Sequence, residues 1–432
     1  MQNVSVKTAV AASDPEANYN GPLAIVTSLF FMWGFLTCLN DILVPHLKSI
    51  FDLSYARVML IQFAFFGAYF IFSIPSAKII DWIGYQRSMV LGLLMMGLGA
   101  FLFVPAASVP SYPLFLGALI VLAAGITCLQ VAANPYVTVL GRPQTASSRL
   151  NLTQAFNSLG TFLAPFFGGL LILSAAPKAM EDIRAMAPDA LQAYRLHEAA
   201  TVKTPYVGLG IALVVLAIAI GSFKLPKIEH AQHKVGEKVD DSIWSHPNLI
   251  FGAISIFVYV GAEVSIGSFL VNYFSQPDIG GLTEKVAASF VAFYWGGAMV
   301  GRFIGSGLLQ KVKTGKLLGI CAICAAGLVA ISMLTTGHFA MWSIIFVGFF
   351  NSIMFPSIFT LGVAELGPLT GDGSGVMIMA IVGGAIIPLA QGWIADKIGI
   401  HHAFFLPVIC YLYILFFALS GSKPNSERHA KA

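Results

Sequence analysis

Twelve long apolar runs constrain this 432-residue chain more than any other feature of its sequence. A helix needs about 20 predominantly apolar residues to cross the hydrocarbon core of a bilayer. Because lipid offers no hydrogen bonds, a spanning segment must satisfy its backbone internally, as a helix does. The runs therefore predict twelve membrane-spanning helices, near residues 24–47, 57–80, 87–108, 112–140, 148–174, 204–223, 247–274, 284–310, 315–335, 339–366, 372–396 and 401–421.

Composition supports a membrane protein and excludes several other classes. Hydrophobic residues make up 57% of the chain and charged residues only 10%, whereas a soluble domain carries about 25% charged residues. A net charge of +4 gives no support for nucleic-acid binding. The CxxC formed by Cys321 and Cys324 lies in an apolar run without a second pair, so we interpret it as structural. We expect no cofactor and no enzyme activity, since neither a nucleophile–base pair nor a metal-binding cluster is evident.

The distribution of Lys and Arg predicts the orientation. With the N-terminus inside the cell, 16 of these residues fall on the cytoplasmic side and 8 on the other. An even number of spans places both termini on that side, with residues 175–203 outside. The polar stretch at mid-chain divides the spans six and six. We thus expect a cytoplasmic tail, a six-helix half, a cytoplasmic linker, a second six-helix half and a cytoplasmic tail, at residues 1–20, 21–223, 224–246, 247–421 and 422–432.

The two halves resemble each other. A shift of 221 residues aligns Pro135 with Pro356 and Gln130 with Asn351, and a shift of 223 aligns Pro165 with Pro388. Parallel repeats of this kind imply a central cavity near the bilayer midplane. Each proline, including Pro135 and Pro388, removes a backbone hydrogen bond and can bend its helix around that cavity.

The first span carries an acid at depth. Asn40 and Asp41 have apolar residues on both sides, and a charged group within hydrocarbon costs at least about 2.5–3.5 kcal/mol. Asp41 either marks the membrane interface or faces a watery cavity, where it would bind substrate or a coupling cation. We favour the second interpretation, which leaves a proton or a sodium ion as the cation.

Amide side chains gather on neighbouring spans. Gln130 and Asn134 are four residues apart and Gln154 and Asn157 are three apart, so each pair shares a helix face. Amides both donate and accept hydrogen bonds, which suits a ligand made of hydroxyl groups. One amide alone is more often an interhelical hydrogen bond, but two pairs favour a polar pocket. The second half adds two further candidates, Glu263 and Asn351.

The loop between the second and third spans, PSAKIIDWIGYQR, resembles the loop signature of the major facilitator superfamily in a degenerate form. Lys78, Asp81 and Arg87 could form a charge relay that holds one state of a gate. A simple cluster of charges beside the membrane is the alternative. We expect Arg302 to serve the equivalent loop of the second half.

Five ordered segments make the resemblance specific. FFMWGFLTCLNDIL, CLQVAANPYVTVLG, RLNLTQAFNSLG, MFPSIFTLG and GGAIIPLAQGWIADKIG together resemble the fucose–galactose–glucose cation symporter family, and within it the bacterial glucose/galactose transporters. The resemblance runs through both halves. It implies a major-facilitator fold, an inner-membrane location and hexose uptake driven by a cation gradient.

The resemblance also implies residue roles. Asp41 matches the essential membrane acid of the L-fucose permease, and Gln154 and Asn157 match its sugar-contacting amide pair. Gln130 stands where that permease has a glutamate for proton coupling, and Glu263 where it has an amide. This exchange puts a direct transfer of the two-acid proton mechanism in doubt and argues against L-fucose as substrate.

The sequence thus predicts a secondary active transporter for glucose and galactose that works by alternating access, as a monomer in the lipid bilayer. Gln130, Asn134, Gln154, Asn157 and Asn351 would bind sugar, Asp41 would bind the cation, and Glu263 would serve either. We favour the proton over sodium. An L-fucose–proton symporter and a membrane sugar sensor that does not transport are the alternatives.

Overall fold

The computed structural model describes residues 19–51, 55–109, 111–171, 186–201, 203–228 and 241–424, and these residues form helices and connecting turns without a β-strand. The first half contains α1 (Asn20–Phe51), α2 (Tyr55–Ser108), α3 (Tyr112–Val139), the short 3-10 helix η1 (Pro143–Thr145), α4 (Ala146–Leu171), α6 (Pro188–Thr201) and α7 (Lys203–Ser222).

The second half begins with the 3-10 helix η3 (Ile243–Ser245) and α8 (Pro247–Phe274). It continues through α9 (Glu284–Leu308), α10 (Thr314–Leu334), α11 (Gly337–Asn351), α12 (Met354–Gly362), η4 (Gly367–Leu369), α13 (Thr370–Met379), η5 (Ala380–Val382), α14 (Gly383–Ile398), α15 (Ile400–Ala403), α16 (Phe405–Phe416) and the π-helical turn η6 (Phe417–Gly421).

The helices follow the predicted spans closely. Among the described residues, nine helical stretches are long and apolar enough to cross a membrane. One of them holds two predicted spans, because α2 has 54 residues and breaks at Gly84, where φ is +80°. A straight helix of that length would measure about 81 Å, far more than one crossing needs. Glycine adopts this left-handed conformation without the steric penalty that a side chain would add.

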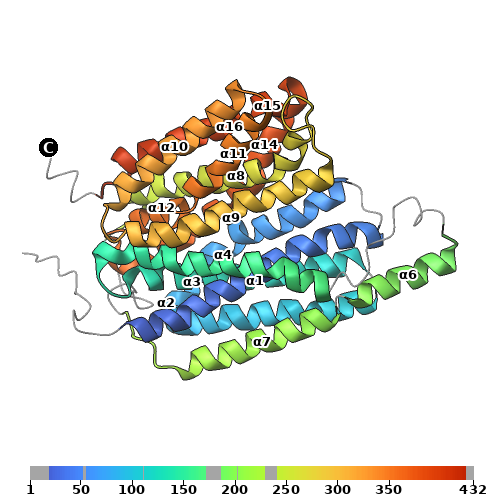
Figure 1. The fold of residues 1–432 in the computed structure, drawn as a ribbon. Coiled ribbons are helices and arrows are strands. Elements are labelled where there is room, and N and C mark those ends of the chain that lie inside the picture. The colour runs from blue at the N-terminus through green and yellow to red at the C-terminus, as the bar shows by residue number, and fades with distance from the viewer. Residues whose placement is uncertain are drawn as a thin grey trace, which may run out of the picture.

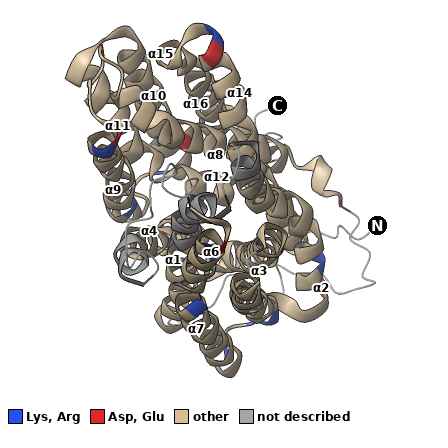
Figure 2. Cartoon of the chain, turned by 90° about the vertical axis from the view of Figure 1, so that its right-hand side faces the viewer, with Lys and Arg blue, Asp and Glu red and all other residues tan. Residues whose placement is uncertain are grey.

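The two halves lie side by side as helical bundles whose helices run in roughly the same direction (Figure 1). α1 to α7 occupy one side and α8 to α16 the other. Figure 2 looks along the helices and shows few charged positions among the described residues. Small residues allow close packing within a half: Gly34 and Gly160 leave no room for a Cβ where α1 meets α4. This use of glycine is typical of helices that pack in lipid.

Two predicted spans are interrupted near the prolines that align between the halves. The tenth breaks at Ser352 and Ile353, between α11 and α12. Pro356 has no N–H to donate one turn back, to the carbonyl of Ser352, which explains a break at this point. The eleventh passes from α13 through η5 to α14, ahead of Pro388. The side chain of Pro165 lies outside the described residues.

A helix that the sequence analysis did not anticipate lies in the polar connection 175–203. α6 has 14 residues and low mean hydropathy, with Asp189 in its first turn. An acid at this position interacts favourably with the helix dipole. Its polar composition hides it from a search for apolar runs.

Candidate functional site

Hydrogen bonds between the two halves gather at one end of the described molecule. Near the start of α4, the hydroxyl of Ser147 lies 2.6 Å from that of Thr360 on α12, and Ser148 donates to the carbonyl of Ser306 on α9. One turn further along α4, the Asn151 amide donates to the Arg302 carbonyl at 2.6 Å. We call this region the closed end. Its side chains hold α4 against α9 and α12.

An ion pair joins the halves at the same end. Lys78 Nζ on α2 lies 2.8 Å from Asp372 Oδ1 on α13 and 3.6 Å from Asp81 Oδ2. Asp81 is buried, whereas Arg87 is exposed and makes no hydrogen bond or ion pair within the described part of the chain. Lys78 and Asp81 therefore form the predicted charge cluster together with Asp372, which the sequence analysis did not select.

Arg302 differs from its predicted place. It lies within α9 rather than in a loop, and its guanidinium bonds the Ser158 hydroxyl of α4. Its Nε also donates to the Ser352 carbonyl at 3.3 Å. Arg302 thus connects the break in the tenth span with the other half of the molecule.

The first half places its predicted amides in the interior. Gln130 Nε2 donates to the Tyr69 hydroxyl at 2.7 Å, and Oε1 has no partner within the described structure. Asn134 is fully buried, and the described residues offer neither its Oδ1 nor its Nδ2 a hydrogen bond. Gln154 is likewise buried with Nε2 unpaired among them. These atoms retain hydrogen-bonding capacity at positions that water does not reach.

Asn157 has a structural contact of its own. Its Nδ2 donates to the Phe30 carbonyl of α1 at 2.9 Å, and it retains some solvent exposure. The Thr161 hydroxyl bridges the two helices nearby, since it lies within hydrogen-bond reach of the carbonyls of Gly34 and Asn157. Asn157 therefore ties α4 to α1, and its Oδ1 is the atom left for another partner.

The second half builds a connected cluster around its predicted acid. The Tyr259 hydroxyl lies 2.9 Å from Glu263 Oε1 and 3.0 Å from the Asn351 carbonyl. Asn351 Nδ2 donates to the Tyr294 hydroxyl at 2.9 Å, and Tyr294 lies 3.4 Å from the Glu263 carbonyl. We call these four residues the tyrosine–glutamate cluster. Tyr259, Tyr294 and Asn351 are fully buried, whereas Glu263 as a residue is partly exposed.

The structure brings some predicted residues together and leaves others apart. Glu263 and Asn351 meet through Tyr259. Within the described residues, no hydrogen bond joins Gln130, Asn134 and Gln154 to one another. Asn40 and Asp41 fall in α1, but their side chains lie outside the described structure.

Two residues of the site were not predicted, although the sequence contains a pattern that indicates each of them. Tyr259 precedes Glu263 by four residues and therefore lies on the same helix face. Asp372 stands 223 residues after Arg149, the shift that aligns the fifth and eleventh spans. The partnership of Tyr69 with Gln130 had no such signal, because it depends on how α2 packs against α3.

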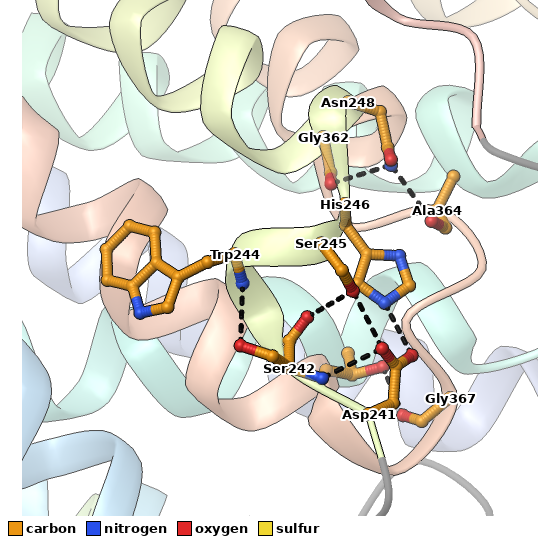
Figure 3. A network of polar contacts seen from close by, with 10 residues as sticks. Asp241, Ser242, Trp244, Ser245, His246, Asn248, Gly362, Ala364 and Gly367 are labelled. Atoms are coloured by element: carbon orange, nitrogen blue, oxygen red, sulfur yellow. Dashed lines mark hydrogen bonds and ion pairs between the residues drawn. The ribbon is translucent and has the colours of Figure 1, made fainter.

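The end of the central linker makes an ordered turn at the cytoplasmic boundary predicted for α8 (Figure 3). Asp241 accepts hydrogen bonds from the Ser245 hydroxyl at 2.7 Å and the Ser242 amide at 2.8 Å, and it pairs with His246 Nε2 at 2.7 Å. The bonds to Ser245 and then to His246 hold the pKa of the Asp241 carboxyl below its ordinary value. Asn248 donates to carbonyls at the end of α12 and just beyond it, that of Gly362 at 3.1 Å and that of Ala364 at 3.0 Å.

The described residues contain no group of three or more His, Cys, Asp or Glu side chains that could hold a metal ion. Cys321 and Cys324 are free thiols on α10.

Comparison with known proteins gives one consistent result. Residues 25–381 match the model of the Major Facilitator Superfamily. The chain is 54% identical to the glucose/galactose transporter of Brucella abortus, over 94% of this chain and 96% of that protein. It is 36% identical to the L-fucose-proton symporter of Escherichia coli, over 97% and 98%.

The fold agrees with a solved relative. A crystal structure of a major facilitator superfamily transporter in the outward conformation superposes with a TM-score of 0.86 at 34% identity, covering 94% of this chain and 99% of that one. The predicted all-helical major-facilitator fold is thereby confirmed. The chain belongs to the major facilitator superfamily and, within it, to the fucose–galactose–glucose cation symporter family.

Proposed function

We propose that this protein imports hexoses, glucose and galactose above all, by symport with a cation. The relatives supply the substrate class, because the Brucella protein is named a glucose/galactose transporter and the Escherichia coli protein an L-fucose-proton symporter. The high identity to the first makes glucose and galactose the preferred substrates. L-Fucose is the second candidate, supported by the second relative.

One observation carries the sugar proposal. Buried amide atoms of Gln130, Asn134 and Gln154 have no partner within the described structure, and neither does Oδ1 of Asn351. A buried polar atom without a hydrogen bond costs about 1–3 kcal/mol. A ligand whose hydroxyl groups both donate and accept is the kind of partner that such amide atoms can bind. Hexoses have this chemistry, and their C–H faces suit the aromatic rings beside the amides, such as Tyr69.

The closed end suits alternating access. If both termini lie in the cytoplasm, the closed end is the cytoplasmic end. The conformation is then outward-facing, the state that binds sugar from outside the cell. The superposition on an outward-facing relative supports this assignment. Opening would break the contacts of Ser147, Ser148 and Asn151 to the second half, which are hydrogen bonds of modest net strength. We place the protein in the bacterial inner membrane.

The acidic residues within the spans are the candidate binding sites for the coupling cation. Gln130 cannot titrate, so Asp41 and Glu263 are the candidates within the spans. We favour a proton that binds Asp41, the residue that matches the family's essential acid. A sodium ion held by Asp41 with neutral oxygens is the competing arrangement, since hard cations prefer oxygen ligands.

Reconstituted protein tests the proposal. Labelled glucose, galactose and L-fucose are offered to proteoliposomes under an imposed proton gradient, an imposed sodium gradient or neither. Accumulation of glucose and galactose under the proton gradient alone supports the proposal as stated. Binding without uptake would favour a sugar sensor over a transporter.

A further inference from the structure

The Tyr259 hydroxyl lies between two acceptors that belong to different helices. Glu263 Oε1, four residues further along α8, is 2.9 Å away, and the carbonyl of Asn351 at the end of α11 is 3.0 Å away. A phenol carries one hydrogen, so it can donate to only one of them at a time. The position of that hydrogen therefore depends on which acceptor needs it more.

The protonation state of Glu263 decides the choice. An ionised carboxylate only accepts, so Tyr259 donates to it, and the Asn351 carbonyl loses that donor. A protonated carboxyl can donate its own hydrogen to the Tyr259 oxygen, and the phenol hydrogen then turns to Asn351. No proton leaves Tyr259 in this exchange. The hydrogen bond between Tyr259 and Glu263 reverses its direction, and the bond from Tyr259 to the Asn351 carbonyl is gained or lost.

Asn351 is the residue at which this choice affects the fold. It is the last residue of α11, directly before the break at Ser352 and Ile353. The Ser352 carbonyl accepts from Arg302, whose guanidinium also bonds α4. Beyond the break, α12 carries Thr360, which contacts Ser147 at the closed end. The carbonyl that Tyr259 bonds is therefore next to the backbone segment that makes contacts between the halves, through Arg302 on one side and α12 on the other.

Among the residues that the structure describes, Arg302 of α9 is the opposite charge that interacts with Glu263. The remaining titratable neighbours that interact with Glu263 in the described structure are phenols: Tyr259, Tyr294 of α9 and Tyr411 of α16. Tyr294 is occupied by the Asn351 amide and the Glu263 backbone. Of the three phenols, Tyr259 is therefore the one that lies within hydrogen-bond distance of both the carboxylate oxygen and the Asn351 carbonyl.

We propose that Tyr259 is a positioning residue that transmits the protonation state of Glu263 to the break between α11 and α12, and through it to the closed end. The inference rests on the proposed function, since it makes Glu263 part of cation coupling rather than a simple sugar ligand. It also gives the second half a side chain that can titrate, whereas Gln130 in the first half cannot.

The first test measures the hydrogen bonds themselves and needs no transport. Infrared difference spectra of the purified protein are recorded across a pH titration. The carboxyl band of Glu263 is identified by its loss in Glu263→Gln. Tyr259→Phe should shift that band and its titration midpoint, whereas Tyr273→Phe should change neither. Tyr273 is the matched control, because it lies on the same helix and its hydroxyl bonds Ser332 of α10 instead. An unchanged Glu263 band in Tyr259→Phe would overturn the relay.

The second test measures coupling. In proteoliposomes, Tyr259→Phe should keep counterflow of labelled glucose near the wild-type rate but reduce gradient-driven accumulation by about tenfold, the size expected when a hydrogen bond to a charged group is lost. Adding Tyr259→Phe to Glu263→Gln should cause little further loss. Wild-type accumulation in Tyr259→Phe would contradict the relay. Absence of counterflow in the wild type would instead contradict the proposed function, and the infrared result would still decide the relay.

Discussion

Lys78 and Asp372 are 294 residues apart in the sequence, yet their charged groups lie 2.8 Å apart and join the two halves of the molecule. The lysine side chain is 49% exposed and the aspartate 15%. The contact belongs to a conformation in which the closed end is shut. Any conformation that opens this end must separate the pair.

Removing this ion pair should favour opening. A pair with one exposed partner contributes about 0.2–1 kcal/mol, so Asp372→Asn should shift the equilibrium toward the open form by up to roughly fivefold. The shift is measured as faster labelling of a cysteine introduced at Ser306. The reversed pair, Lys78→Asp with Asp372→Lys, should restore slow labelling. Equal labelling in all three proteins would show that the ion pair does not hold the closed end.

Substitution of the α4 amide Gln154 should affect sugar binding without affecting stability. Gln154→Ala removes a side chain whose Nε2 is unpaired among the described residues, so it should weaken sugar binding several-fold while thermal stability stays close to wild type. Binding is measured by titration calorimetry with glucose. Unchanged affinity would remove Gln154 from the sugar site.

Asn157 serves as the comparison. Asn157→Ala should also weaken binding, but it loses the bond to the Phe30 carbonyl that ties α4 to α1. We therefore expect an additional loss of about 0.5–1.5 kcal/mol in stability, measured as a lower melting temperature. A variant with normal affinity and reduced stability would make Asn157 a structural residue only.

The orientation can be tested with two exposed positions. Gln192 lies on α6, and Lys227 lies in the linker between the halves. In intact cells an impermeant thiol reagent should label Gln192→Cys and leave Lys227→Cys unmodified, in a background that lacks the five native cysteines. Disrupted cells should label both. The opposite pattern in intact cells would reverse the predicted topology.

The stability of the turn before α8 should depend on pH. Because the folded pKa of Asp241 is lowered by its bonds to Ser245 and His246, its stabilising effect is present above the unfolded pKa of about 3.9. That effect is lost as the pH falls through the lower folded value. Hydrogen exchange of the segment should be faster in Asp241→Asn than in wild type at pH 7, and the two should converge once the pH falls below the lowered folded pKa of Asp241. A difference that persists in acid would assign the stability to another contact.

The sequence predicts the spans of this fold well, for a physical reason. Each crossing needs a long apolar run that bonds its own backbone, and such runs are visible without tertiary information. Pro247–Phe274 is the clearest case, since α8 occupies the same residues as the predicted run 247–274. α6 was not predicted because its polar composition leaves no apolar run to detect.

The site was only partly predictable. Gln130, Gln154 and Glu263 could be selected because polar groups are costly among apolar residues. Their partners depend on how helices dock, so the sequence could not show that Lys78 pairs with Asp372 or that Gln130 bonds Tyr69. The break before Pro356 was predictable in part. The proline indicates that the helix is interrupted, but the contact between Asn351 and Tyr259 beside the break can be seen only in the folded structure.

Gradient-driven uptake by Asp41→Asn tests whether the first span carries the coupling cation. Proteoliposomes that contain wild type or Asp41→Asn are given labelled glucose with an imposed proton gradient, an imposed sodium gradient or no gradient. Wild type should accumulate glucose under the proton gradient alone. Asp41→Asn should abolish accumulation while it retains counterflow, because a neutral amide of the same shape can neither take up nor release a proton. Accumulation by Asp41→Asn at the wild-type level would show that cation coupling does not reside at Asp41.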